Sequence, residues 1–145
     1  MSKKPILIVA GEPYSIFSEI FFKSLKKSNF KRPIVLIASK KIFKQQMKKL
    51  GYRYYFEEID KNLSKKIISK KNVINIIDIK FNFKKTFDKI TDKSNKYIEN
   101  CFFTAHNLFR DKKAYALING PISKKNFLKN KYLGITEYLA KMNKI

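Results

Sequence analysis

Residues 5–27 read PILIVAGEPYSIFSEIFFKSLKK, and this stretch decides the fold. Residues 5–10 form a nearly continuous apolar run, which is typical of a parallel strand covered on both faces. Residues 11–13 interrupt the run, and apolar residues then recur from Ser15 onward at helical i, i+4 spacing. Lysines gather near Lys26, where positive charge suits a helix C-terminus. A buried strand, a turn and a helix predict an α/β unit.

The same alternation continues along the chain. Further apolar runs predict strands at residues 33–39, 53–59, 72–79 and 114–118. Helical patterns lie at residues 40–50, from Ser94 as an N-cap to about residue 109, and at 135–144, whereas residues 60–93 are less regular. Strands that alternate with helices indicate right-handed crossovers. We therefore predict an α/β fold with three layers, in which helices cover both faces of a mainly parallel sheet.

The composition predicts one soluble domain over residues 1–145. A domain of about 150 residues buries roughly 70% of the surface that its unfolded chain exposes. The sequence is 44% hydrophobic, too apolar for a disordered chain, and has no apolar run of membrane-spanning length. Gly11 interrupts the first apolar run before a secretion signal can form. With one cysteine, the chain cannot form an internal disulfide. These features predict a cytoplasmic protein.

The formal charge of +22 raises the hypothesis of nucleic-acid binding through phosphate neutralisation. However, only Arg32, Arg53 and Arg110 among the 33 basic residues are arginine. Arginine is the residue that favours base reading and bidentate phosphate contacts. The lysines are also spread from Lys3 to Lys144. We interpret them as a solvated coating and keep a small basic nucleic-acid-binding domain as an alternative.

The residue types of common catalytic centres are scarce. Cys101 lies on the apolar stripe of the predicted helix after Ser94, which favours a small buried side chain over a nucleophile. His106 is the only histidine, and one imidazole cannot assemble a transition-metal site. Neither a P-loop nor a Gly-x-Gly-x-x-Gly turn is present. The sequence therefore directs attention to loops at the end of the sheet.

One such loop follows the first strand, because parallel sheets place ligand sites at the carboxyl ends of their strands. Gly11 would let backbone approach a ligand closely, and Pro13 would fix the turn. The N-terminus of the following helix would offer free N–H groups to an anion. An ordinary turn between a strand and a helix is the alternative interpretation.

A second loop follows the fifth strand. Gly120 and Pro121 would turn the chain there, Ser123 could cap a short helix, and Lys124 or Lys125 could face inward. Further on, residues 134–137 read GITE and offer a threonine hydroxyl and a carboxylate. Neither loop is specific by itself.

Together, the two loops resemble the N-terminal half of the 4-hydroxythreonine-4-phosphate dehydrogenase family of pyridoxal phosphate biosynthesis. The resemblance extends from Pro5 to about Met142. It is strongest at residues 11–20 (GEPYSIFSEI), 117–124 (LINGPISK) and 134–139 (GITEYL).

This resemblance implies NAD-dependent oxidation of a phosphorylated hydroxy-amino acid, 4-phosphohydroxy-L-threonine, followed by decarboxylation. It also implies a divalent metal (Zn, Mg or Co) and a homodimer. In the family, the metal ligands and most of the cofactor site lie in a second half that this sequence lacks. The resemblance therefore implies a truncated chain that is inactive alone. It assigns Thr136 as a substrate contact and places Lys124 and Glu12 near the site, without any catalytic residue.

The sequence departs from the family at Ile135, where the family has a histidine that contacts substrate. A hydrocarbon side chain cannot replace that hydrogen bond, and an unpaired polar group costs roughly 1–3 kcal/mol. This departure favours an alternative function, that of a catalytically inactive relative that binds a phosphorylated metabolite.

Overall fold

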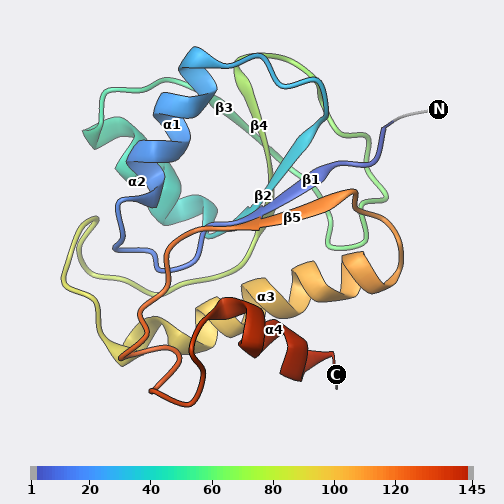
Figure 1. The fold of residues 1–145 in the computed structure, drawn as a ribbon. Helices are drawn as coiled ribbons and strands as arrows, with labels where there is room; N and C mark the ends of the chain where they lie inside the picture. Colours follow the sequence, from blue (N-terminus) through green and yellow to red (C-terminus); the bar gives the residue numbers. More distant parts are fainter. Residues whose placement is uncertain (1–2, 144–145) are drawn as a thin grey trace.

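The five predicted strands form one parallel sheet. The computed structural model describes residues 3–143, and its strands lie in the order β3-β4-β2-β1-β5 (Figure 1). All four neighbouring pairs are parallel, which confirms the predicted α/β class. The strands are β1 (Ile6–Val9), β2 (Ile34–Ala38), β3 (Tyr55–Glu58), β4 (Val73–Asp78) and β5 (Ala116–Asn119).

Helices cover both faces of this sheet, which confirms the three predicted layers. The helices α1 (Phe17–Lys27) and α2 (Lys40–Lys49) lie on one face, and α3 (Asn95–Arg110) lies on the other with α4 (Ile135–Met142) beside it (Figure 1). A short 3₁₀ helix, η1 (Asp92–Ser94), leads directly into α3.

The core is divided between the two faces of the sheet, which explains the continuous apolar runs in the sequence. On β2, Leu36 packs with the residues of α1 and α2, whereas its neighbour Ile37 packs with those of α3. Both side chains are completely buried. A strand that is covered on both faces needs an apolar residue at every position, so alternation disappears.

Several element boundaries differ from the predicted ones by one or two residues. The helix predicted from Ser15 begins at Phe17, because the Ser15 hydroxyl accepts a hydrogen bond from the Phe17 amide (3.2 Å) in a turn that precedes the helix. The last strand begins at Ala116, whereas the prediction began it two residues earlier. Gly51, with φ of +79°, ends α2 as its left-handed conformation permits. Part of the helix predicted at 135–144 lies outside the described residues.

Within residues 3–143, each helix is too short or too polar to cross a bilayer.

The aromatic cluster between α1, α2 and the sheet should dominate the stability of that face. Phe22 is completely buried there, whereas Phe103 on α3 is 59% exposed. We expect Phe22→Ala to lower the free energy of unfolding by about 3–5 kcal/mol through cavity formation. The matched Phe103→Ala change should alter it by no more than about 0.5 kcal/mol. Urea denaturation of both variants measures the difference, and equal losses would contradict this description of the core.

Candidate functional site

The loops after β1 and β5 meet at the carboxyl edge of the sheet. The two strands are neighbours, with Val9 paired to Asn119 at their ends. The Gly120 amide donates to the Val9 carbonyl (2.7 Å), and the Glu12 amide donates to the Pro121 carbonyl (2.8 Å). The two loops therefore lie in contact, as predicted from the sequence. We call residues 10–13 and 119–121 the loop junction.

Glycine is required on both sides of the loop junction. A Cβ atom at Gly11, where φ is +78°, would overlap the Pro121 carbonyl oxygen. A Cβ atom at Gly120 would overlap the Ala10 carbonyl oxygen and lie 2.8 Å from the Phe17 ring. The close neighbour of each glycine is thus protein backbone. For this reason the two glycines do not form an open cradle for a cofactor phosphate.

Glu12 connects the loop junction to the start of α3. Its side chain is 2% exposed, and its carboxylate accepts hydrogen bonds from the Ser94 hydroxyl (2.7 Å) and from the Tyr14 amide (3.2 Å). Burial raises the pKa of Glu12, and these hydrogen bonds offset part of the increase. Ser94 lies at the predicted N-cap position of α3, but its hydroxyl donates to this carboxylate and its side chain makes no capping hydrogen bond.

Gln46 lies on α2 and binds the first loop of the junction, a role that was not predicted from the sequence. Its amide nitrogen donates to the carbonyl oxygens of Pro13 (2.8 Å) and Thr86 (3.1 Å). The available signal was a polar residue on the buried stripe of α2, between Phe43 and Met47. A buried amide needs hydrogen-bond partners, and here the partners are backbone groups of two loops.

Thr136 and Ile135 form the first turn of α4. The Thr136 side chain is exposed, whereas Ile135 is half-buried against the apolar residues on the α3 side of the sheet. Gly134 precedes them with extended backbone, and the Glu137 carboxylate accepts from the Leu133 amide (2.7 Å). The Thr136 hydroxyl makes no hydrogen bond to any residue in the described range 3–143, whereas the Ile135 side chain packs against the core.

Lys124 lies in a turn after the loop junction. The Ser123 hydroxyl accepts from the Asn126 amide (3.0 Å), but the segment forms a turn in place of the predicted short helix. Lys124 and Lys125 are both exposed, so neither faces inward as predicted. The Asn126 backbone carbonyl accepts from the side-chain Nδ2 of Asn95 (2.7 Å), which attaches this turn to the start of α3.

The four predicted site residues are only partly brought together. Glu12 lies in the loop junction, and Lys124 comes three positions after Pro121, the last residue of that junction. Among the described residues, no hydrogen bond joins Glu12 to Lys124, Ile135 or Thr136. Their assignment to substrate remains a prediction.

Other reactive side chains offer little chemistry. Cys101 is completely buried, as predicted, and burial raises its thiol pKa to about 12, so it is a poor nucleophile at neutral pH. His106 is half-buried on α3. In the part of the chain that the structure describes, no three His, Cys, Asp or Glu residues are grouped as metal ligands would be.

Comparison with known protein families gives a match over most of the chain. The family described as "Pyridoxal phosphate biosynthetic protein PdxA" matches residues 29–145. The chain belongs to the PdxA family. The match includes the second loop of the junction and α4, and the predicted family resemblance is confirmed. The comparison with curated protein sequences finds no match.

Solved structures share the PdxA fold with this chain. A 4-hydroxythreonine-4-phosphate dehydrogenase from Burkholderia phymatum aligns with a TM-score of 0.84 at 19% identity, over 100% of this chain and 45% of its own. A putative 4-hydroxythreonine-4-phosphate dehydrogenase from Salmonella typhimurium gives 0.78 at 22% identity, over 97% of this chain and 44% of its own. The 4-hydroxythreonine-4-phosphate dehydrogenase from Klebsiella pneumoniae gives 0.78 at 22% identity, over 96% and 44%. This chain thus spans less than half the length of each.

Substitution of Gly120 at the loop junction should destabilise the protein. Because its neighbours are backbone atoms, Gly120→Ala must displace one loop, and we expect a loss of roughly 1–3 kcal/mol in the free energy of unfolding. Gly134→Ala is the control, since nothing lies within 4 Å of its added Cβ atom. Its stability should change by about 0.5 kcal/mol at most. Guanidinium denaturation compares the two, and an undamaged Gly120→Ala variant would contradict the close contact.

The buried carboxyl of Glu12 predicts a pH dependence. Its folded-state pKa is raised above 4.5, so the folded protein binds this proton more tightly than the unfolded chain. The contribution of Glu12 to stability therefore falls as the pH rises from 4.5 through the folded-state pKa. Relative to wild type, Glu12→Gln should gain stability over this interval and then keep a constant difference. Denaturation curves between about pH 4 and about pH 8 measure this difference. The opposite trend would show that the hydrogen bonds outweigh burial.

Proposed function

We propose that this chain is the N-terminal part of a 4-hydroxythreonine-4-phosphate dehydrogenase of pyridoxal phosphate biosynthesis. The reaction is NAD-dependent oxidation of 4-phosphohydroxy-L-threonine, followed by decarboxylation. The observation that carries the proposal is the family match over residues 29–145. The shared fold of three structures with that enzyme name supports it.

Two buried polar atoms lie next in sequence to residues that contact the loop junction. The buried oxygens Ser18 Oγ and Asn95 Oδ1 lack a hydrogen-bond partner among the described residues. Ser18 follows Phe17, whose ring lies against Gly120, and Asn95 follows Ser94, which binds Glu12. Both atoms are buried, so they are not themselves ligand contacts. We place the substrate at this edge because parallel α/β sheets bind ligands at the carboxyl ends of their strands.

The described residues do not themselves fit a metal ion or NAD. They contain no cluster of metal ligands, and backbone fills the space beside the junction glycines. We propose that the divalent metal and NAD are held by protein segments equivalent to the part of the relatives that this chain does not span. A homodimer, as the family resemblance implies, is part of the same proposal.

One specific observation favours a second candidate function. Ile135 packs against the core and has no hydrogen-bonding group where the resemblance implies a histidine. A protein that binds the phosphorylated substrate without oxidising it is consistent with this change. Such a protein would be a catalytically inactive relative.

One experiment separates these functions. The purified protein is titrated with 4-phosphohydroxy-L-threonine by calorimetry. NADH formation is then measured by absorbance, with NAD and Mg²⁺, Zn²⁺ or Co²⁺ present, in a fusion of this chain to the C-terminal part of a 4-hydroxythreonine-4-phosphate dehydrogenase, which supplies the segments that this chain does not span. Substrate binding with NADH formation supports the dehydrogenase. Binding without NADH formation supports the inactive relative, and the absence of binding contradicts both.

The exposed hydroxyl of Thr136 gives a sharper test of the substrate site. Thr136→Val removes the hydroxyl and keeps the shape, so we expect substrate binding to weaken about five- to tenfold through one lost hydrogen bond. Thr136→Ser keeps the hydroxyl and should bind within about twofold of wild type. Because the side chain is exposed, neither change should alter the unfolding temperature. Equal binding by both variants would remove Thr136 from the site.

A further inference from the structure

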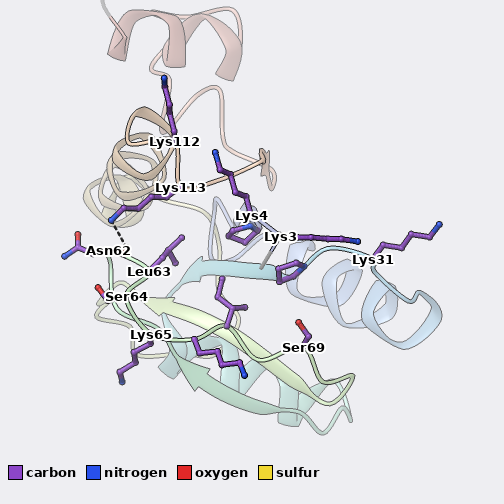
Figure 2. A pocket seen from close by; sticks show the side chains of 14 residues that line it. Lys3, Lys4, Lys31, Asn62, Leu63, Ser64, Lys65, Ser69, Lys112 and Lys113 are labelled. Carbon is purple, nitrogen blue, oxygen red and sulfur yellow. Dashed lines mark hydrogen bonds between the residues drawn. The ribbon is translucent and has the colours of Figure 1, made fainter. Parts of the chain in front are cut away.

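A basic hollow lies at the amino edge of the sheet, at the opposite ends of the strands from the loop junction. Its volume is about 910 Å³, and Figure 2 shows the side chains around it. Half of its fourteen lining residues are lysines, from four separate segments: Lys3, Lys4, Lys31, Lys65, Lys66, Lys112 and Lys113. We call this feature the lysine hollow.

One wall of the lysine hollow is ordered by a carboxylate. Asp60 accepts hydrogen bonds from the backbone amides of Lys65 (2.9 Å), Ser64 (3.2 Å) and Asn62 (3.2 Å). These bonds, that of Lys65 above all, hold the pKa of Asp60 at about 2, so the carboxylate stays charged. The Lys113 ammonium donates to the Asn62 carbonyl (2.9 Å), which ties this loop to the segment between α3 and β5 (Figure 2).

The other walls are joined by Arg32. Its guanidinium lies 3.7 Å from the centre of the Tyr115 ring and donates to the Lys4 carbonyl (3.4 Å). The Tyr115 amide donates to the Pro5 carbonyl (2.8 Å) in addition. The three segments that precede β1, β2 and β5 are therefore fixed to one another. This arrangement uses Arg32 for structure, and within residues 3–143 Lys113 is the only one of the seven lysines whose side chain makes a hydrogen bond.

The ammonium groups around the hollow are not neutralised. No acidic side chain lines the hollow, and within residues 3–143 none of its lysines forms an ion pair. Figure 2 shows Lys31 and Lys112 extending outward, so their heads remain in solvent. Like charges that surround a concave surface raise the local positive potential and attract anions. A bound anion would relieve their mutual repulsion.

From this geometry we propose that the lysine hollow binds a small molecule that carries several phosphate groups. Lysine binds phosphate as a point charge, and the hollow is within the size range of small-molecule sites. Lysines from four segments line one concavity. A nucleic-acid strand would instead need basic groups along an extended track, with aromatic side chains for stacking. The compact arrangement therefore favours a compact polyanion.

Inorganic tripolyphosphate is the probe for this site, titrated by calorimetry at about 50 mM salt, where screening is weak. The site variant carries Lys65→Gln, Lys66→Gln and Lys112→Gln. The control variant carries Lys44→Gln, Lys48→Gln and Lys49→Gln on the exposed face of α2, outside the hollow. Both variants remove three charges from the formal +22. We expect affinity to fall about tenfold in the site variant and less than about twofold in the control, since each exposed ion pair contributes modestly.

Three results would overturn the proposal. Wild-type protein that does not bind tripolyphosphate would exclude the site, and equal losses in both variants would show that only net charge acts. Binding of oligouridylate without binding of tripolyphosphate would assign the surface to nucleic acid. Thermal unfolding of both variants verifies that they are folded. If the site variant unfolds, a variant with Lys3→Gln and Lys31→Gln replaces it, and a variant with two of the three α2 substitutions is its control. The same loss of tripolyphosphate affinity relative to the control is expected.

Discussion

The backbone contact between the loops after β1 and β5 is the constraint on which the rest of the structure depends. Because Gly11 and Gly120 have no side chain, the two loops can exchange hydrogen bonds at the edge of neighbouring strands. Glu12 then extends from this contact to Ser94, which sets the start of α3, and Gln46 binds the same loop from α2. Both helical layers are thereby positioned against one point of the sheet. A larger residue at either glycine would disturb all of these contacts together.

The sequence predicts most of the fold because burial on both faces leaves a local signal. The apolar runs around Leu36 and Ile37 require a strand whichever neighbour it has, so the strands and the layers could be predicted. Strand order could not be predicted, because no local pattern shows that β4 lies between β2 and β3. The N-cap position of Ser94 was predicted correctly, but the partner of its hydroxyl could not be predicted, for a similar reason. A serine before a helix usually caps it, but a buried carboxylate that is 82 residues away in the sequence competes for its hydroxyl.

The candidate site was predictable to a smaller extent than the fold. The two glycine loops could be located from sequence, since turns after parallel strands share one edge. The role of Gln46 could not, because its partners are carbonyl groups that any residue supplies. The lysines present the reverse case: their even spread along the sequence suggests a uniform coating, yet folding gathers seven of them around one hollow. Which charged residues lie close together in space depends on the topology of the fold, so composition alone cannot predict such a cluster.

The central proposal is that the loop junction and the start of α4 form one site for a phosphorylated substrate in this PdxA-family chain. The most direct test is to follow backbone amide NMR signals while 4-phosphohydroxy-L-threonine is added to the protein. We predict that the largest shifts occur at residues 11–15, 120–124 and 134–137. Shifts confined to other parts of the chain, or shifts in only one of these segments, would contradict the account.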